Sequence, residues 1–133
     1  GPTLLNNGVR DLSSRRSMLG RQNPRTGIGM VEPGHFIAIT VDGRQNKYSV
    51  GMTIEELTQM FYLLGCQTAY NLDGGASTAM IFMGECLNQH TGTGSDVQRP
   101  WTDGLVWGKS ELVPTVDDPV YNTGAKPWVM PPT

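Results

Sequence analysis

The sequence predicts an α+β fold, in which a mainly antiparallel sheet carries one main helix packed on one face. One stretch, Thr53–Leu64, places apolar side chains at helical spacing, whereas several shorter apolar segments are separated by turns rich in Gly, Asn and Asp. The chain has 133 residues, of which 38% are hydrophobic and 17% are charged. These values are typical of one globular domain with a single core.

The first 29 residues are predicted to form a short strand, a turn, a basic loop and a tight segment. Thr3–Leu5 is the strand, and Asn6–Gly8 has the composition of a turn. In the tight segment Asn23–Gly29, Pro24 keeps the preceding residue extended. The segment therefore places Arg25 in a defined position.

Phe36–Val41 gives the strongest strand signal, because it is rich in β-branched and aromatic residues. The run is almost continuously apolar, so we expect it to be buried on both faces or nearly so. Tyr48–Val50 is predicted to pair with it as a hairpin. The bend of that hairpin would carry both Asp42 and Arg44.

The predicted helix begins at a capping box formed by Thr53 and Glu56, whose side chains can bond each other's free backbone amides. Gly65 fits a left-handed residue just after the helix end. The apolar spacing predicts about three turns between these signals. Met60 and Phe61 are interpreted as core residues rather than ligand contacts.

The most informative stretch is Asn71–Thr78, where an acidic side chain precedes two glycines and two hydroxyls. Gly74 and Gly75 would weaken a strand, which favours a role that needs positive φ or close backbone approach to a ligand. A plain hairpin turn is the alternative. The stretch is predicted to join two buried strands, Thr68–Tyr70 and Thr78–Met83.

The remaining chain is predicted to form a surface loop containing His90, a last short strand at Leu105–Trp107, and a tail. The loop histidine is interpreted as solvated rather than as an acid or base. Residues 1–109 are assigned to the domain. Residues 110–133 are rich in Pro and lack periodicity, so we interpret them as an extended tail or linker.

Composition argues against several classes of partner. The net charge of −2 provides no basic surface for nucleic acid, and no apolar run is long enough to span a membrane. Neither metal nor cofactor is expected, since calcium-loop and zinc-type spacings are missing from the sequence. Cys66 and Cys86 are interpreted as buried free thiols, with a disulfide as the alternative.

Charged residues that fall at predicted strand ends or glycine-rich turns suggest an anionic ligand. Guanidinium groups bind phosphate oxygens in pairs of hydrogen bonds, and a nearby carboxylate can act as a nucleophile or general base. The sequence therefore predicts a phosphate-bearing substrate. The residues concerned are Arg25, Arg44, Arg99, Asp42 and Asp73.

Four motifs occur in order along the chain: Asn23–Gly29, Val41–Arg44, Tyr48–Leu57 and Asn71–Thr78. They resemble the motifs of the phosphodiester glycosidase family, and the resemblance runs from Gly1 to Val106. It implies hydrolysis of a sugar-1-phosphodiester at the glycosidic bond, which releases the sugar and leaves a phosphomonoester. It also implies an extracytoplasmic or secreted protein.

The resemblance also implies roles for individual residues. Asp73 and Asp42 would be the carboxylates that act as nucleophile or base, or that stabilise an oxocarbenium ion. A phosphomonoester is a fair leaving group, so cationic stabilisation of its oxygens can matter more than general-acid help. Contacts to phosphate or sugar are expected from Arg25, Arg44, Arg99, Asn71, Ser77 and Thr78 and from the amides of Gly74 and Gly75.

The chain departs from the family pattern in two ways. Ala76 replaces a third glycine, which adds one methyl group. The family's N-terminal half is missing, so a separate polypeptide could complete the domain. The alternative function is a non-catalytic glycan-binding, phosphate-binding or structural assembly module, such as part of an envelope or virion.

Overall fold

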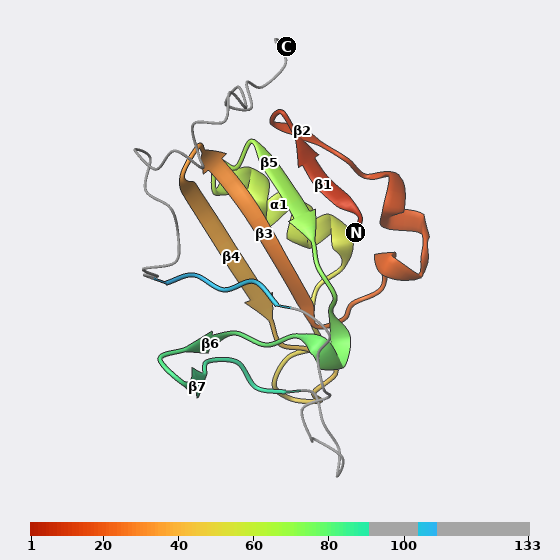
Figure 1. Ribbon diagram of the computed structural model, residues 1–133. Helices are drawn as coiled ribbons and strands as arrows, with labels where there is room; N and C mark the ends of the chain where they lie inside the picture. Colours follow the sequence, from red (N-terminus) through yellow and green to blue (C-terminus); the bar gives the residue numbers. More distant parts are fainter. Residues whose placement is uncertain (91–103, 109–133) are drawn as a thin grey trace. The chain divides into compact units, whose positions relative to one another are not determined.

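The computed structural model describes residues 1–90 and 104–108, which belong to two units, Gly1–Pro100 and Trp101–Thr133 (Figure 1). The first unit contains all the elements described below. In chain order they are β1 (Thr3–Asn6), β2 (Val9–Arg10), η1 (Ser13–Arg16), η2 (Met18–Gly20), β3 (Arg25–Glu32), β4 (His35–Val41), α1 (Ile54–Leu63), β5 (Thr68–Asn71), η3 (Gly75–Ser77), β6 (Ile81–Phe82) and β7 (Glu85–Cys86).

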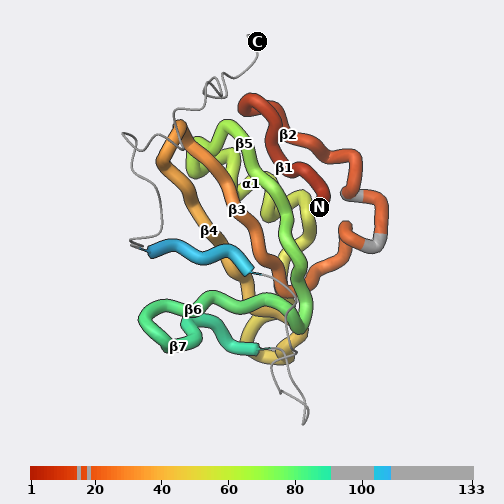
Figure 2. Tube along the Cα trace, in the orientation of Figure 1, coloured from red at the N-terminus to blue at the C-terminus, as the bar shows by residue number. Residues whose placement is uncertain are grey.

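Five strands form one sheet in the order β2-β1-β5-β3-β4, and every neighbouring pair is antiparallel. β2 and β4 lie at opposite edges of this sheet, as Figure 2 shows. The helix α1 packs against β1, β2, β3 and β5. The predicted class, an α+β fold with a mainly antiparallel sheet and one main helix, is confirmed.

The helix α1 begins at the predicted capping box. The Glu56 amide donates to Thr53 Oγ1 at 3.1 Å, and the Thr53 amide donates to Glu56 Oε2 at 2.8 Å. Two free amides of the first turn are thereby satisfied. The chain leaves the helix through Gly65, whose φ is +80°. Phe61 is fully buried as expected, whereas Met60 is only half-buried.

The interior strand β3 contains two glycines because the helix packs directly on it. A Cβ added at Gly27 would lie 2.7 Å from Phe61 Cε2, and one added at Gly29 would lie 2.7 Å from Phe61 Cδ1. Glycine in a strand interior often marks such close approach. Within the predicted tight segment Asn23–Gly29, the residues from Arg25 onward belong to β3, a strand that was not predicted from the sequence.

Two predictions for β4 are wrong. Its hairpin partner is β3 rather than Tyr48–Val50, and the later segment forms only an isolated bridge between Gln45 and Ser49. The strand is also not buried on both faces, since Phe36 is 50% exposed. The physical reason is position: β4 lies at the sheet edge, and α1 packs on the other strands.

The chain after the glycine-rich turn forms less regular structure than predicted. The expected strand Thr78–Met83 is reduced to β6, which pairs with β7 in a small exposed hairpin. Residues 104–108 have no regular secondary structure, so the predicted strand Leu105–Trp107 is wrong. Short apolar runs do not by themselves distinguish strand from irregular chain.

Both cysteines are free thiols, but only one is buried. Cys66 packs in the core, whereas Cys86 lies exposed at the end of β7. The prediction of two buried thiols is therefore correct for Cys66 alone. In the described part of the chain, none of the helices has the length and apolar character needed to cross a membrane.

Candidate functional site

The glycine-rich turn after β5 packs on the segment that leads into β3. The Leu72 amide donates to Thr26 O at 2.8 Å. A Cβ added at Gly74 would lie 2.7 Å from Pro24 O, and Gly75 has a φ of +62°. Gly75 thus has the predicted positive φ, and Gly74 the predicted close approach. The close neighbour of Gly74 is the backbone of Pro24 rather than a ligand.

Both glycine amides of this turn already have partners. The Gly74 amide donates to Asp73 Oδ1 at 3.0 Å, and the Gly75 amide donates to Pro24 O at 3.0 Å. These amides would have to leave their partners before they could bind an anion. The predicted use of Gly74 and Gly75 as ligand donors thus requires a rearrangement of the turn.

Two glycines of a second loop pack on the same segment. A Cβ added at Gly43 would lie 2.7 Å from Pro24 N, and Gly51, with a φ of +94°, contacts the backbone of Asn23. The Asn23 amide and carbonyl also pair with Met52. The residue pair Asn23–Pro24 therefore brings together the loop after β4 and the turn after β5.

Arg44 is the predicted phosphate ligand that is best placed. Its Nε and Nη2 both donate to Asn23 Oδ1, at 3.0 and 2.9 Å. A Cβ added at Gly75 would lie 3.3 Å from both Nη1 and Nη2 of Arg44. The exposed guanidinium therefore lies against the turn that contains Asp73, which is exposed as well.

Arg25 lies close to Arg44 but is bound by backbone carbonyls. It is 4% exposed, and its Nε donates to Met52 O at 2.9 Å while Nη2 donates to Arg21 O at 2.7 Å. Burial, and secondarily the charge of Arg44, lowers the pKa of Arg25. Its observed contacts therefore hold together the polypeptide around the start of β3.

The Asp42 carboxylate fixes the chain that follows the β6–β7 hairpin. It accepts hydrogen bonds from the Gln89 amide at 3.0 Å, from Asn88 Nδ2 at 3.2 Å and from the Tyr48 hydroxyl at 3.0 Å. The hydrogen bond and charge of Asp42 raise the pKa of Tyr48. A carboxylate with three such donors is well suited to positioning the chain.

Asn71 and Thr78, at the two ends of the turn, are almost completely buried. Asn71 is 4% exposed, and its Nδ2 donates to Gly1 O at 3.1 Å and Leu72 O at 2.9 Å. Thr78 is 2% exposed, and among the described residues its Oγ1 has no hydrogen-bond partner. A buried hydroxyl without a partner is costly, which makes this atom a candidate ligand contact.

The other predicted site residues add less. Ser77 lies in η3, where its amide donates to Gly74 O at 3.1 Å. Arg99 lies outside the described residues. Within residues 1–90 and 104–108, no group of three or more His, Cys, Asp and Glu side chains is arranged to hold a metal ion.

Two asparagines that the sequence did not single out position the site. Asn23 orients Arg44, as described above. Asn88 accepts from the Met80 amide at 2.7 Å and donates to Thr78 O at 3.1 Å as well as to Asp42. Asn23 lies inside the motif Asn23–Gly29 and could have been found, whereas Asn88 lies in a polar loop without a recognisable pattern.

Comparison with known families shows where this chain belongs. Residues 1–107 match the family model described as phosphodiester glycosidase. The chain belongs to the phosphodiester glycosidase family. The matched range includes the turn Asn71–Thr78, the segment Asn23–Pro24 and the loop that carries Arg44.

Individual relatives are much longer than this chain. The SPbeta prophage-derived uncharacterized protein YomE of Bacillus subtilis (strain 168) is 37% identical over 70 residues, which are 53% of this chain and 11% of YomE. The crystal structure of a hypothetical protein from Synechocystis is 26% identical, with a TM-score of 0.57 over 68% of this chain and 17% of that one.

A third comparison shows the fold. The catalytic domain of zebrafish N-acetylglucosamine-1-phosphodiester alpha-N-acetylglucosaminidase, in a form auto-inhibited by its pro-peptide, is 20% identical with a TM-score of 0.57. The match covers 68% of this chain and 33% of that chain. The chain therefore spans a third or less of each of these three relatives.

Proposed function

We propose that this chain is part of a hydrolase that cleaves the glycosidic bond of a sugar-1-phosphodiester. Water adds to the anomeric carbon, the bond from that carbon to the phosphate oxygen breaks, and the products are a free sugar and a phosphomonoester. The observation that carries the proposal is the position of the Arg44 guanidinium against Gly75, in the same turn as Asp73. The Arg44 guanidinium therefore lies against the loop that carries the Asp73 carboxylate.

We assign different tasks to the charged residues. Arg44 binds the phosphate and stabilises the charge that develops on it as the bond breaks. Asp73 acts at the sugar, as nucleophile, base or electrostatic partner of an oxocarbenium ion. The Thr78 hydroxyl, which has no hydrogen-bond partner among the described residues, contacts an oxygen of the substrate. Arg25 and Asp42 contribute chiefly by holding the surrounding loops.

We propose further that a working site needs polypeptide beyond these 133 residues. The chain matches one third of the zebrafish catalytic domain. Most of a ligand's surface is enclosed in typical sites, whereas Arg44 and Asp73 are exposed on two loops. The polypeptide that completes the domain lies either in the same protein or in a separate chain. We also propose an extracytoplasmic location.

The test uses the chain together with the polypeptide that completes it, incubated with a methyl diester of N-acetylglucosamine-1-phosphate. Phosphorus NMR follows the conversion of the diester to methyl phosphate. We expect Asp73→Asn to reduce the rate by roughly 100-fold or more, because a reacting carboxylate is lost. Asp11→Asn is the matched control, since that exposed carboxylate bonds Ser13, which is not among the residues assigned to the site.

Full hydrolysis by the Asp73→Asn variant would contradict the assignment of Asp73. If the wild-type complex binds the diester but never releases methyl phosphate, the second candidate gains support. That candidate is a glycan-binding or phosphate-binding structural module, and the prophage origin of the relative YomE favours it. Tight binding without turnover, together with a location in assembled particles, would identify such a module.

A further inference from the structure

The outer edge of β4 is suited to pair with another strand. β4 spans seven residues, His35–Val41, and within the described residues its only strand partner is β3. The run Phe36–Val41 contains neither a charged residue nor proline. Free sheet edges are usually protected by charges, proline or a bulge that twists the strand away. The run Phe36–Val41 has neither charges nor proline, so its unpaired backbone groups are accessible to an added strand.

Apolar surface continues from this edge onto both faces of β4. Phe36 is 50% exposed, and Ala38 is exposed on the same face. On the other face, Ile37 and Ile39 pack against the core but stay only half-buried, because the main strand contacts of α1 are with β1, β2, β3 and β5. A polypeptide that added a strand here would therefore also find apolar side chains to cover.

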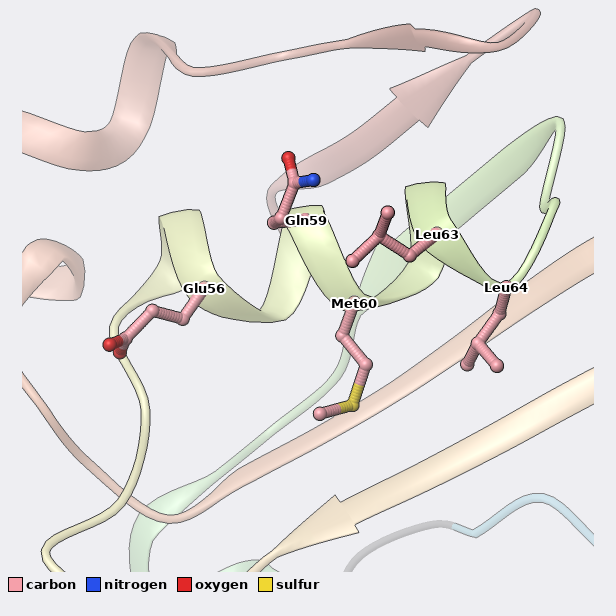
Figure 3. Close-up of a pocket in the computed structure, with 5 residues that line it drawn as sticks. All are labelled: Glu56, Gln59, Met60, Leu63 and Leu64. Atoms are coloured by element: carbon pink, nitrogen blue, oxygen red, sulfur yellow. The ribbon is translucent and has the colours of Figure 1, made fainter.

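One face of α1 extends this uncovered layer. It lines a groove of about 370 Å³, formed by Glu56, Gln59, Met60, Leu63 and Leu64 (Figure 3). Leu63 is 74% exposed and Leu64 is 46% exposed. Figure 3 shows Met60 and Leu64 directed to the side of the helix on which β3 and β4 are drawn. The helix layer is thus left open beside the strand edge.

We propose that the polypeptide which completes this phosphodiester glycosidase domain adds a β-strand to the outer edge of β4 and covers α1 beside it. This inference rests on one part of the proposed function, namely that further polypeptide completes the domain. It does not require that the completed domain hydrolyses a substrate. The surface determines the chemistry of the added strand. The strand should be uncharged, and every second side chain, directed toward the helix layer, should be apolar. Relatives have room for it, since the chain matches 33% of the zebrafish domain and 17% of the Synechocystis protein.

A second copy of this chain fits the surface less well. Two β4 strands paired edge to edge would satisfy each other's backbone groups. Ile37 and Ile39 of each copy would stay half-buried, because each α1 would keep its contacts with β1, β2, β3 and β5 of its own copy. The apolar layer would stay open. The occupant must therefore supply both a strand and a covering layer.

Site-specific photo-crosslinking tests the position of this contact. The photoreactive residue p-benzoylphenylalanine replaces Ala38 on β4, and in a control protein it replaces Val9, which is 69% exposed on β2 at the opposite edge. Each protein is produced together with the polypeptides encoded beside its own gene and then irradiated. We expect position 38 to crosslink to a segment that matches a part of the phosphodiester glycosidase domain not contained in these 133 residues. The yield of this crosslink should be at least 10-fold higher than the yield from position 9.

A charge on the edge provides the second measurement. Ala38→Lys is expected to weaken binding of the crosslinked polypeptide by at least 10-fold in calorimetry, whereas Val9→Lys leaves it unchanged. A thermal unfolding scan of each variant shows that the chain itself remains folded. A crosslink to a second copy, to an unrelated protein, or to the family segment equally from both positions would overturn the proposal. These readouts do not depend on hydrolysis, so an inactive complex with the predicted contact would refute the proposed function alone.

Discussion

Asn23 Oδ1 accepts two hydrogen bonds from one guanidinium, from Arg44 Nε at 3.0 Å and from Arg44 Nη2 at 2.9 Å. Arg44 follows β4 by three residues, and Asn23 precedes β3 by two. The amide oxygen therefore fixes the plane of the guanidinium, so that its edge lies against Gly75. The orientation of the best-placed cation in the candidate site depends on a neutral side chain.

Asn23→Ala should therefore impair the site more than the fold. Without the Oδ1 acceptor the guanidinium loses its orientation, and we expect kcat/KM for the sugar-1-phosphodiester to fall by roughly 10- to 100-fold, as small misplacements of catalytic groups do. Phosphorus NMR assays of the completed enzyme give this ratio. Asn46→Ala, in an exposed turn, is the control and should be neutral. An unchanged kcat/KM for Asn23→Ala would mean that Arg44 does not act on the substrate.

Gly74→Ala should destabilise the chain, because the new Cβ would lie 2.7 Å from Pro24 O. Such overpacking costs about 1–3 kcal/mol. Urea unfolding followed by far-ultraviolet circular dichroism, which reports the loss of the sheet and of α1, measures the change. The exposed neighbour Ala76 provides the control, since Ala76→Gly restores the family's third glycine and should cost less than about 1 kcal/mol. Equal stability of the Gly74→Ala variant and the wild type would show that the turn can move away from Pro24.

Gly27 and Phe61 should behave as a coupled pair. A Cβ at Gly27 would lie 2.7 Å from the Phe61 ring, so Gly27→Ala alone should be destabilising. Phe61→Leu alone should also be destabilising, because it leaves a cavity in the core. In the double variant the smaller side chain makes room, and we expect a favourable coupling of about 0.5 kcal/mol or more. Strictly additive effects on the free energy of unfolding would show that the Phe61 ring is not the reason for a glycine at position 27.

Asp42→Asn should separate a positioning role from a catalytic one. The carboxylate accepts from Gln89, Asn88 and Tyr48, so its loss should loosen the chain after β7. We expect faster proteolysis of that segment and a rate of hydrolysis that remains well above that of Asp73→Asn. If Asp42→Asn abolishes hydrolysis while protease resistance is unchanged, Asp42 is itself catalytic.

The two thiols should differ in reactivity and in their dependence on pH. Burial raises the pKa of Cys66 above its ordinary value of 9.0, whereas Cys86 is exposed. At pH 8 we expect iodoacetamide to modify Cys86 rapidly and Cys66 only in denaturant, as intact mass would show. Because the unfolded thiol at position 66 loses its proton at lower pH, the Cys66 contribution to stability is present below pH 9.0 and decreases as the pH rises above it. Cys66→Ala should reduce that decrease, and an equal decrease in the variant would assign it to other groups.

The helix and the glycine-rich turn could be predicted because their signals are local. Thr53 and Glu56 define the helix start by direct contact between near neighbours in sequence. The need for a close approach at Gly74 follows from its missing side chain, although the sequence does not say which backbone comes close. The answer, Pro24, lies fifty residues away in the chain.

The strand pairing and the state of the charged side chains could not be predicted in the same way. Gly27 and Gly29 give no strand signal in the sequence, and their reason appears only in the structure, where Phe61 packs on them. Arg25 and Asp42 have the chemistry of ligand-binding residues, yet their observed partners are backbone carbonyls and loop donors. Such engagement depends on contacts between distant segments, which neither composition nor spacing reveals.

The packing of two loops on Asn23–Pro24 ties the candidate site to the cooperativity of the whole domain. Its parts come from segments separated by about fifty residues, so the site exists only when the sheet has formed. A molecule that binds there binds the folded state alone, and at 100 times its Kd it would stabilise that state by about 2.7 kcal/mol. A shift in melting temperature across a collection of sugar phosphates therefore offers a search for the natural ligand that works whichever reaction the site performs.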